Sequence, residues 1–516
     1  MSRTVGNDAM PMDYDCIIVG AGPTGAVLTA LLGRAGHRVL VLERDAEVYP
    51  LPRAVHMDHE IMRVLQQLGV VEQLAAHASS VDDYLFQNAA GEILLKVRGG
   101  GQLANSGYLA STMFVQPELE AILRAELANI PTVDARFGAL VTDLVTNDGV
   151  KVTFEHNDQT HHASGRYLIG CDGASSFVRR ALATEMEDLG FDEPWVVVDT
   201  LIKRDIGLPE HTAYQFCDPR RPTTCVPAGP GRRRWEFMLL PGESRETMGQ
   251  WESVWPLLEP WGGRDAIEPV RLAVYRFHAL IAQRWRVGPV LLAGDAAHQT
   301  PPFMGQGLCS GVRDSANLAW KLDRILTGRA GESLLDSYQV ERAPHFRHVV
   351  ETSVAMGRIV CELDETKAAQ RDAFMKAARQ AGERNLGAPR GGQVAPLVTG
   401  VMRADDSGAG WLFPQPTGHT NGSEGRMDDL LGCGLRLVTD VPEMIPDAKL
   451  LAQTGATVVL LGTGGFIESA APSAVDWLGE RKVHAALVRP DHYVFGTARD
   501  RAGATRLLAD FSRATG

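Results

Sequence analysis

A glycine-rich turn between two short apolar segments near the amino terminus most strongly constrains the fold. Residues 15–19 (DCIIV) predict a buried strand, and GAGPTG follows with Gly20, Gly22 and Gly25 in the G-x-G-x-x-G spacing. The next residues, AVLTALLGRAG, have helical apolar spacing, and HRVLVLERD predicts a second strand. This strand, turn, helix and strand unit indicates an α/β, Rossmann-like fold that binds a dinucleotide.

Each glycine of this turn has its own task in such a unit. The first permits a tight turn, the second lets the backbone approach a pyrophosphate, and the third lets helix and strand pack closely. The helix amino terminus offers N–H donors to the phosphates, and a carboxylate ending the second strand suits a ribose diol. The turn alone does not separate FAD from NAD. The contacts expected here are Gly20, Gly22, Pro23, Thr24, Gly25, Glu43 and Arg44.

Two later segments repeat the strand-then-glycine pattern. Residues 167–180 (YLIGCDGASSFVRR) predict a short apolar strand, an Asp-Gly pair and a helix start. Residues 290–314 (VLLAGDAAHQTPPFMGQGLCSGVRD) predict a buried strand, a Gly-Asp pair, a double proline and glycines that open a helix.

The three motifs together resemble the single-component FAD-dependent aromatic hydroxylases, the group that contains para-hydroxybenzoate hydroxylase and phenol hydroxylase. The stretches PRAVHMDHEIMRVLQQLGV, FDEPWVVVDT and LVRPDHYVFGT are most similar to the 3-(3-hydroxyphenyl)propionate hydroxylase branch. The resemblance implies one extended FAD that is held at both ends. It also implies these further cofactor contacts: Arg53, Gln116, Asp172, Gly294, Asp295, Pro302, Gly305, Gln306, Gly307 and Leu308.

Three of these residues also have ordinary structural interpretations. The less favoured alternatives are a surface arginine for Arg53 and an amino-terminal helix cap for Gln116. Asp172 is compatible with a helix N-cap, alone or together with a role in organising FAD and pyridine-nucleotide contacts.

The resemblance also predicts interleaved domains. Residues 12–79, 108–190 and 281–395 are expected to bind FAD, and residues 80–107 and 191–280 to form a β-sheet substrate domain. Residues 402–426 are turn-rich and indicate a linker within a carboxy-terminal region, 396–516, that resembles a thioredoxin-like domain. Because this region lacks Cys-x-x-Cys, we interpret it as structural or dimer-forming, with a homodimer as one alternative.

The implied reaction uses NADH or NADPH, dioxygen and a phenolic substrate. Reduced FAD would form a flavin hydroperoxide that transfers oxygen to the ring, and an ionised phenol is the better acceptor. A phenol has a pKa near 10, so a positioned base should help. Phenol hydroxylase relatives carry an aspartate two residues after the position that corresponds to Arg53, where this chain has Val55. We therefore take His56 as the candidate base, with a packing or FAD-adjacent histidine as the alternative; Asp58 is a weaker candidate or a helix cap.

A substrate carboxylate would require an arginine. Arg234 is a candidate, and Glu236 lies on the same face of its predicted strand two residues later. Arg220 and Arg221 are rivals, and a solvated surface charge is the alternative for each. The expected substrate is a phenolic acid similar to 3-hydroxyphenylpropionate, in aromatic catabolism. The alternatives are a tailoring hydroxylase of a polyketide or other bulky phenol, a non-hydroxylating flavin-binding protein and an NAD dehydrogenase.

Composition excludes several other classes of function. A net charge of −12 argues against a nucleic-acid partner, which favours a basic face. No run of about 18 uncharged apolar residues suggests a membrane span. The seven cysteines lack metal spacing, and His56 and His59 have no third ligand motif, so we expect no metal. With no signal-peptide core in the first residues, a reducing cytoplasm is the expected location.

Overall fold

A computed structural model of the protein describes residues 12–51, 53–381 and 395–516. Its first sheet has eight strands in the order β17-β18-β11-β1-β2-β8, with β10 and β9 added through β11. From β18 to β8 the neighbours are parallel, and their continuous apolar segments suit strands covered on both faces. The strands are β1 (Tyr14–Val19), β2 (Val39–Glu43), β8 (Val133–Phe137), β9 (Leu140–Asn147), β10 (Gly149–His156), β11 (Gln159–Gly170), β17 (Arg286–Val287) and β18 (Val290–Leu292).

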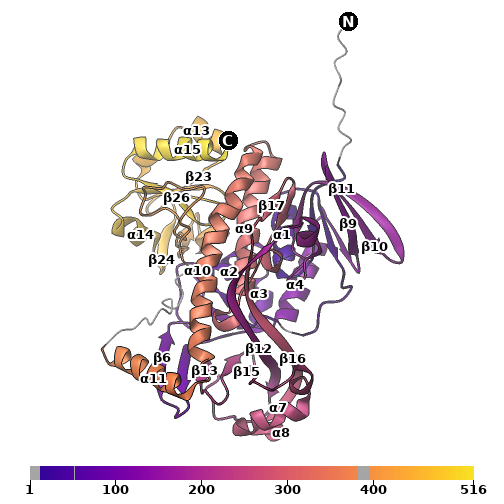
Figure 1. The fold of residues 1–516 in the computed structure, drawn as a ribbon. Helices are drawn as coiled ribbons and strands as arrows, with labels where there is room; N and C mark the ends of the chain where they lie inside the picture. Colours follow the sequence, from indigo (N-terminus) through magenta and orange to yellow (C-terminus); the bar gives the residue numbers. More distant parts are fainter. Residues whose placement is uncertain (1–11, 52, 382–394) are drawn as a thin grey trace.

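The parallel order brings all three glycine motifs to one edge of this sheet. They follow the carboxyl ends of β1, β11 and β18, which are direct neighbours. Helix α1 packs against α4 and α9, and α9 and α10 run side by side through the middle of the molecule (Figure 1). The helices around this sheet are α1 (Pro23–Arg34), α2 (His59–Gln67), α3 (Val71–Ala75), α4 (Gln116–Ala128), α5 (Phe177–Ala181), α9 (Gly307–Leu326) and α10 (Asp336–Val360).

A second eight-stranded sheet has the order β19-β16-β12-β15-β14-β13-β5-β6 and is antiparallel except between β13 and β5. One face packs on Trp251 and Trp255 of α7 and on Trp261 of the turn that follows it, and the opposite face turns toward the first sheet. Its strands and flanking helices are β5 (Asp83–Asn88), β6 (Ile93–Arg98), β12 (Met186–Ile202), β13 (Thr212–Cys217), β14 (Thr223–Pro227), β15 (Arg232–Met238), β16 (Ile267–Ala282), β19 (His298–Gln299), α6 (Arg245–Met248), α7 (Trp251–Leu258), α8 (Gly263–Ala266) and α11 (Glu365–Gln380).

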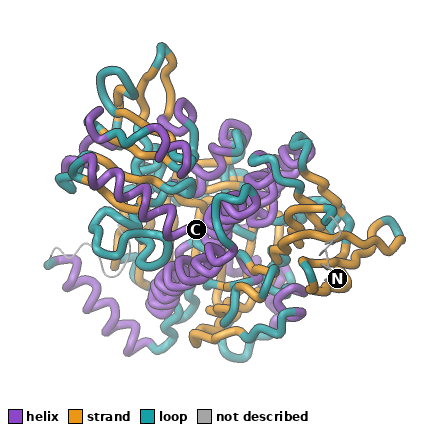
Figure 2. Tube along the Cα trace, turned by 90° about the horizontal axis from the view of Figure 1, so that it is seen from above, coloured by secondary structure: helices purple, strands orange, loops and turns teal. Residues whose placement is uncertain are grey.

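A separate small sheet has the order β3-β7-β4, with β3 (His56–Asp58), β4 (Ala78–Ser80) and β7 (Ser111–Phe114). Seen from above, helices fill the centre of the molecule and strands flank them (Figure 2). Among the helices that the structure describes, none is both long and apolar enough to cross a membrane.

The carboxy-terminal region contains a four-stranded sheet of order β23-β22-β25-β26, in which only β22 and β23 are parallel. This order supports the thioredoxin-like assignment, which stays a prediction, as do the domain boundaries. The expected linker instead ends in a β20–β21 hairpin that β24 extends. The elements are β20 (Thr417–Thr420), β21 (Ser423–Arg426), α12 (Met427–Leu431), β22 (Arg436–Thr439), α13 (Ala448–Thr454), β23 (Thr457–Leu460), β24 (Ile467–Ala470), α14 (Ala474–Glu480), β25 (Ala485–Val488), β26 (Val494–Ala498) and α15 (Arg501–Thr515).

Buried ion pairs attach this region to the helices of the first sheet. Asp428 accepts hydrogen bonds from Arg63 Nε at 2.7 Å and from Arg436 Nη1 at 2.5 Å, and all three side chains are almost fully buried. Arg489 makes a similar buried pair with Glu341 of α10 at 2.8 Å. Burying such charges requires close pairing, so the carboxy-terminal region has one fixed position on α2 and α10.

Candidate active site

A cavity of about 590 Å³ lies between the edge with the glycine motifs and the inner face of the second sheet. Most of the residues predicted to bind cofactor or substrate line it, and they come from both sheets and from α9. These are Gly22, Pro23, Thr24, Arg53, His56, Gln116, Arg234, Glu236, Asp295, Pro302, Gly305, Gln306, Gly307 and Leu308. The predicted residues that do not line it are Gly20, Gly25, Glu43, Arg44, Asp172 and Gly294.

The first glycine turn has the close packing that its spacing predicts. A Cβ on Gly25 would lie 1.9 Å from the carbonyl oxygen of Gly20, and one on Gly20 would lie 2.5 Å from that of Cys171. Gly22 faces the cavity, and a Cβ there would meet nothing within 4 Å. Two glycines are therefore required by packing, whereas the third leaves open space at the amino terminus of α1.

Glu43 ends the second strand and Arg44 follows it, and their side chains lie in different surroundings. The Glu43 carboxylate accepts hydrogen bonds from the backbone N–H groups of Ala21, at 2.7 Å, and Asp45, at 2.9 Å. The Arg44 side chain is 71% exposed and lies 3.5 Å from Asp45. Glu43 is thus held beside the glycine turn, and contacts of either residue with a cofactor stay predictions.

Gln116 fixes the loop that carries Arg53. Its Oε1 accepts hydrogen bonds from the backbone N–H groups of Arg53, at 3.0 Å, and Ala54, at 2.5 Å, while its Nε2 donates to Glu120 at 2.6 Å. Burial raises the pKa of Glu120. The Arg53 guanidinium stays half-exposed at the cavity, 3.9 Å from that carboxylate. The side-chain amide of Gln116 is therefore engaged within the protein, and its direct bond to FAD stays a prediction.

Asp172 stabilises the turn after β11. Its two carboxylate oxygens accept hydrogen bonds from the Ser176 hydroxyl at 2.5 Å and from the Val178 N–H at 3.0 Å. Ser176, not Asp172, is the N-cap of α5. The prediction that Asp172 is the helix N-cap is therefore wrong, although its carboxylate does hold the capping serine and one N–H of the first turn. Cys171, Gly173 and Ala174 of the same turn face the cavity.

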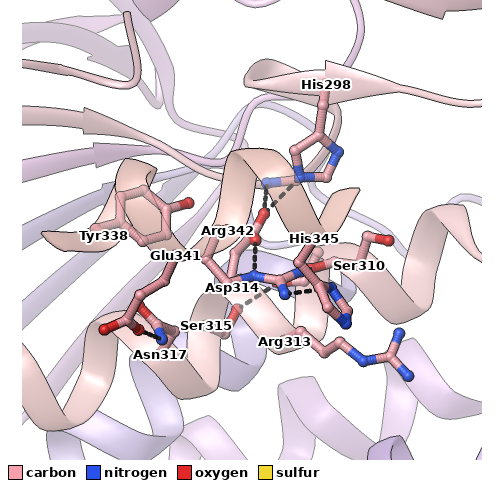
Figure 3. A network of polar contacts seen from close by, with 12 residues as sticks. His298, Ser310, Arg313, Asp314, Ser315, Asn317, Tyr338, Glu341, Arg342 and His345 are labelled. Carbon is pink, nitrogen blue, oxygen red and sulfur yellow. Dashed lines mark hydrogen bonds and ion pairs between the residues drawn. The ribbon is translucent and has the colours of Figure 1, made fainter. Parts of the chain in front are cut away.

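A buried polar network holds the Gly-Asp pair after β18 (Figure 3). Asp314 of α9 accepts hydrogen bonds from the Gly294 N–H at 3.0 Å, from His298 Nε2 at 2.6 Å and from Arg342 Nε at 2.9 Å. Gly294 has a φ of +60°, and a Cβ there would lie 2.7 Å from the Thr24 hydroxyl. The network fixes the backbone from which the next side chain, Asp295, reaches the cavity.

These residues fit FAD. The Asp295 carboxylate is exposed to the cavity, and no described residue hydrogen-bonds it, so it offers acceptors to a hydroxyl-bearing chain. The open space at Gly22 and the helix amino terminus suit a pyrophosphate. The start of α9 at Gly307 adds a second positive helix end to the same cavity.

His56 packs on the loop that precedes α9. Its Nδ1 lies 3.2 Å from the Gly305 carbonyl oxygen, which can only accept, so Nδ1 donates and Nε2 is left as an acceptor in the neutral ring. Burial lowers the His56 pKa and favours this neutral form. Asp58 is the N-cap of α2, as its alternative interpretation predicts, and it also pairs with Arg313 at 2.5 Å.

The inner face of the second sheet carries polar side chains in register. Thr224 of β14 lies opposite both Gln215 of β13 and Glu236 of β15. Two residues before Glu236, Arg234 lies opposite Asp199 of β12. Side chains two residues apart share a face, so these groups all turn toward the cavity. Tyr84 of β5 lines it beside Gln215.

Sequence reasoning missed Tyr84, Gln215 and Thr224. The available signal was the alternation of polar and apolar residues within their short strands, which indicates a face but not its partner.

Arg234 is bound within the protein. It donates to Asp199 from Nε at 2.7 Å and from Nη2 at 3.0 Å, and also to the carbonyl oxygen of Arg53. Arg271 lies 3.4 Å from the same Asp199 carboxylate. The rivals Arg220 and Arg221 lie away from the cavity, paired with Asp218 and Glu243. Arg234, which was expected to bind a substrate carboxylate, is therefore already paired with the Asp199 carboxylate.

Glu236 is the unusual acid of this wall. It is only 6% exposed, and no hydrogen bond reaches its carboxylate from any described residue. Burial raises its pKa from 4.5 to about 7, opposed by Arg234 and Arg271 and assisted by Asp199. A carboxylate with this pKa changes protonation near neutrality and can accept a proton there.

One group of side chains in the described residues has metal-ligand geometry: Asp428, Cys433 and His492. Asp428 is already paired with Arg63 and Arg436. Two guanidinium groups beside the carboxylate oppose a cation, so this cluster belongs to the attachment of the carboxy-terminal region.

Comparisons with known proteins agree with this site. The FAD binding domain family matches residues 13–353. A Rhodococcus jostii (strain RHA1) protein described as "Probable NADH-specific resorcinol 4-hydroxylase" is 38% identical over 95% of this chain and 92% of its own length. A 3-(3-hydroxy-phenyl)propionate/3-hydroxycinnamic acid hydroxylase of Burkholderia vietnamiensis (strain G4) is 32% identical over 96% of this chain and 95% of its own.

A solved structure of aklavinone-11 hydroxylase with FAD and aklavinone covers 98% of this chain and 100% of its own, with a TM-score of 0.79 and 25% identity. The architecture, the cofactor cradle and these relatives confirm the fold class and the reaction class that the motifs indicate. The chain belongs to the FAD binding domain family and is an FAD-dependent aromatic-ring hydroxylase.

Proposed function

We propose that the protein uses NADH and dioxygen to hydroxylate a small, single-ring phenol. The observation that carries this proposal is that the FAD cradle and the polar wall of the second sheet share one cavity of about 590 Å³. That cavity must also receive the isoalloxazine end of FAD, so the remaining room suits one aromatic ring better than a polycyclic phenol. The relatives named for resorcinol and for 3-hydroxyphenylpropionate support a small substrate, and the first supports NADH.

The chain's own residues would bind and deprotonate the phenol. Bound FAD would supply activated oxygen at the isoalloxazine ring. Val55, Val81, Met113, Ala213 and Val226 form an apolar cluster on one side of the cavity that can hold the ring face. Glu236 would accept the phenol proton, since its pKa of about 7 matches that task near neutral pH.

His56 and Arg234 would act around this base. Neutral His56 presents Nε2 as an acceptor beside the Gly305 loop, where the flavin is expected. Arg234, held by Asp199, would stabilise the Glu236 carboxylate from the same strand face. A reducing cytoplasm is the proposed location, since all seven cysteines are free.

The test is NADH oxidation in air by the FAD-loaded protein, with hydroxylated product and peroxide measured together. We expect resorcinol or a 3-substituted phenol to accelerate NADH oxidation and to yield a matching hydroxylated product. Peroxide alone would show an effector instead of a substrate. Acceleration by a polycyclic phenol only would contradict the single-ring proposal and favour a tailoring hydroxylase.

A further inference from the structure

Three side chains on the cavity wall form a directed hydrogen-bond chain that the deprotonation step does not use. The Thr224 hydroxyl donates to Gln215 Oε1 at 2.7 Å, which fixes the amide orientation. Gln215 Nε2 therefore points at the Tyr84 oxygen and donates to it. All three residues line the cavity, and Thr224 and Gln215 are 5% and 1% exposed.

This orientation determines what Tyr84 can do. Because its oxygen already accepts from Gln215, its own proton must be donated elsewhere. The described acceptor for that proton is the Phe303 carbonyl oxygen at 3.4 Å, which is long for an O–H donor whose usual distance is about 2.7–2.8 Å. An oxygen atom of a ligand in the cavity could take this hydrogen bond at a better distance.

The charges around Tyr84 decide which kind of oxygen fits. Glu236 lies on the same wall and would repel a second carboxylate once it is ionised. The neighbouring cations Arg234 and Arg271 both already contact Asp199. With Glu236 ionised, the two arginines are balanced by two carboxylates, Asp199 and Glu236, so a substrate carboxylate would add a third anion beside two cations. A neutral hydroxyl or ether oxygen adds no charge.

We propose that the Thr224–Gln215–Tyr84 chain is a specificity device in which the Tyr84 hydroxyl donates to an uncharged oxygen substituent of the phenol ring. The inference rests on the proposed function, and it narrows the substrate class to phenols with a second, neutral oxygen, as in a dihydroxybenzene. A site built to hydrogen-bond such a group discriminates strongly against an analogue that lacks it.

The test compares resorcinol with m-cresol, in which a methyl group replaces the second hydroxyl, and with 3-hydroxybenzoate, in which it is a carboxylate. Dissociation constants are measured from the change in flavin absorbance of the oxidised FAD enzyme, and kcat/KM from hydroxylated product. We expect the native protein to bind resorcinol roughly tenfold or more tightly than either analogue. Tyr84→Phe should remove most of the resorcinol to m-cresol preference, and Thr224→Val should reduce it several-fold.

Tyr214→Phe is the matched control. Tyr214 lies on β13 next to Gln215 but packs into the tryptophan cluster on the opposite face of the sheet, so the preference should be unchanged. Equal affinity of the native protein for resorcinol and m-cresol would overturn the inference. So would a Tyr84→Phe variant that keeps the native affinity ratio, or a native protein that binds 3-hydroxybenzoate more tightly than resorcinol. If both phenols are still hydroxylated with NADH, the proposed function survives that result; if no phenol binds or reacts, both fall.

Discussion

Replacing Glu236 by glutamine should make the protein more stable and less active at the same time. Burial raises the Glu236 pKa from 4.5 to about 7 in the folded protein. Each pH unit of difference corresponds to about 1.4 kcal/mol. Holding this side chain ionised in the fold therefore costs on the order of 3 kcal/mol above neutral pH. A neutral amide of the same shape removes that cost.

The sign of the pH dependence follows from the direction of the shift. The folded pKa exceeds the unfolded one, so the native protein loses stability as pH rises from about 4.5 to about 7. The melting temperature of Glu236→Gln should match the native value near pH 4.5 and exceed it by a few degrees at pH 8. Thermal unfolding across that pH range measures the gap.

Activity should change in the opposite direction. In the native enzyme, kcat/KM for a neutral phenol should rise about tenfold per pH unit up to about pH 7 and then level off, because only ionised Glu236 accepts the proton. Glu236→Gln should lose this acidic limb and lower the plateau by about 10²-fold or more. Glu268→Gln is the control, since that glutamate is half-exposed on β16 and paired with Lys203. An unchanged acidic limb, or a variant that is destabilised at pH 8, would refute the assignment.

Three further variants probe the scaffold. Asp314→Asn should weaken FAD binding roughly tenfold, measured by flavin fluorescence, because the carboxylate orients the Gly294 N–H and the buried side chains of His298 and Arg342. Gly305→Ala should lower the ratio of product to peroxide, since its φ is +62° and a Cβ would lie 2.8 Å from the adjacent histidine ring. Asp428→Asn should destabilise the protein by about 3–5 kcal/mol in chemical denaturation, because it leaves two buried arginines without their anion. Asp429→Asn, at the exposed neighbouring position, should stay within about 0.5 kcal/mol.

The cofactor side of the site was predictable because backbone geometry requires its residues. Gly25 cannot carry a side chain while Gly20 lies against it, and Gly294 needs both a positive φ and the space beside Thr24. Such requirements leave glycines at fixed spacings after apolar strands. The same reasoning located the strand ends correctly, and the parallel order then placed three motifs at one edge.

The substrate wall was less predictable because it depends on pairing between strands far apart in the chain. Arg234 and Glu236 were expected to share a face, and they do, but nothing local indicated that Asp199 would occupy the guanidinium. The β20–β21 hairpin had a recognisable signal in Asn421-Gly422, a pair that favours a tight hairpin turn. Because this pair lies within the turn-rich residues 402–426, the whole segment was interpreted as a linker.

This difference between the two sides explains how one architecture serves different phenols. The FAD-binding side is specified by glycines and by the Asp314 network, and altering it should weaken FAD binding. The opposite wall is specified by side chains that alternate on β5, β13, β14 and β15, and they can change without moving the backbone. An aklavinone hydroxylase can therefore share this fold with a TM-score of 0.79 at 25% identity. Substrate choice in this chain should consequently follow the few inward positions of those strands, with Tyr84 and Glu236 foremost among them.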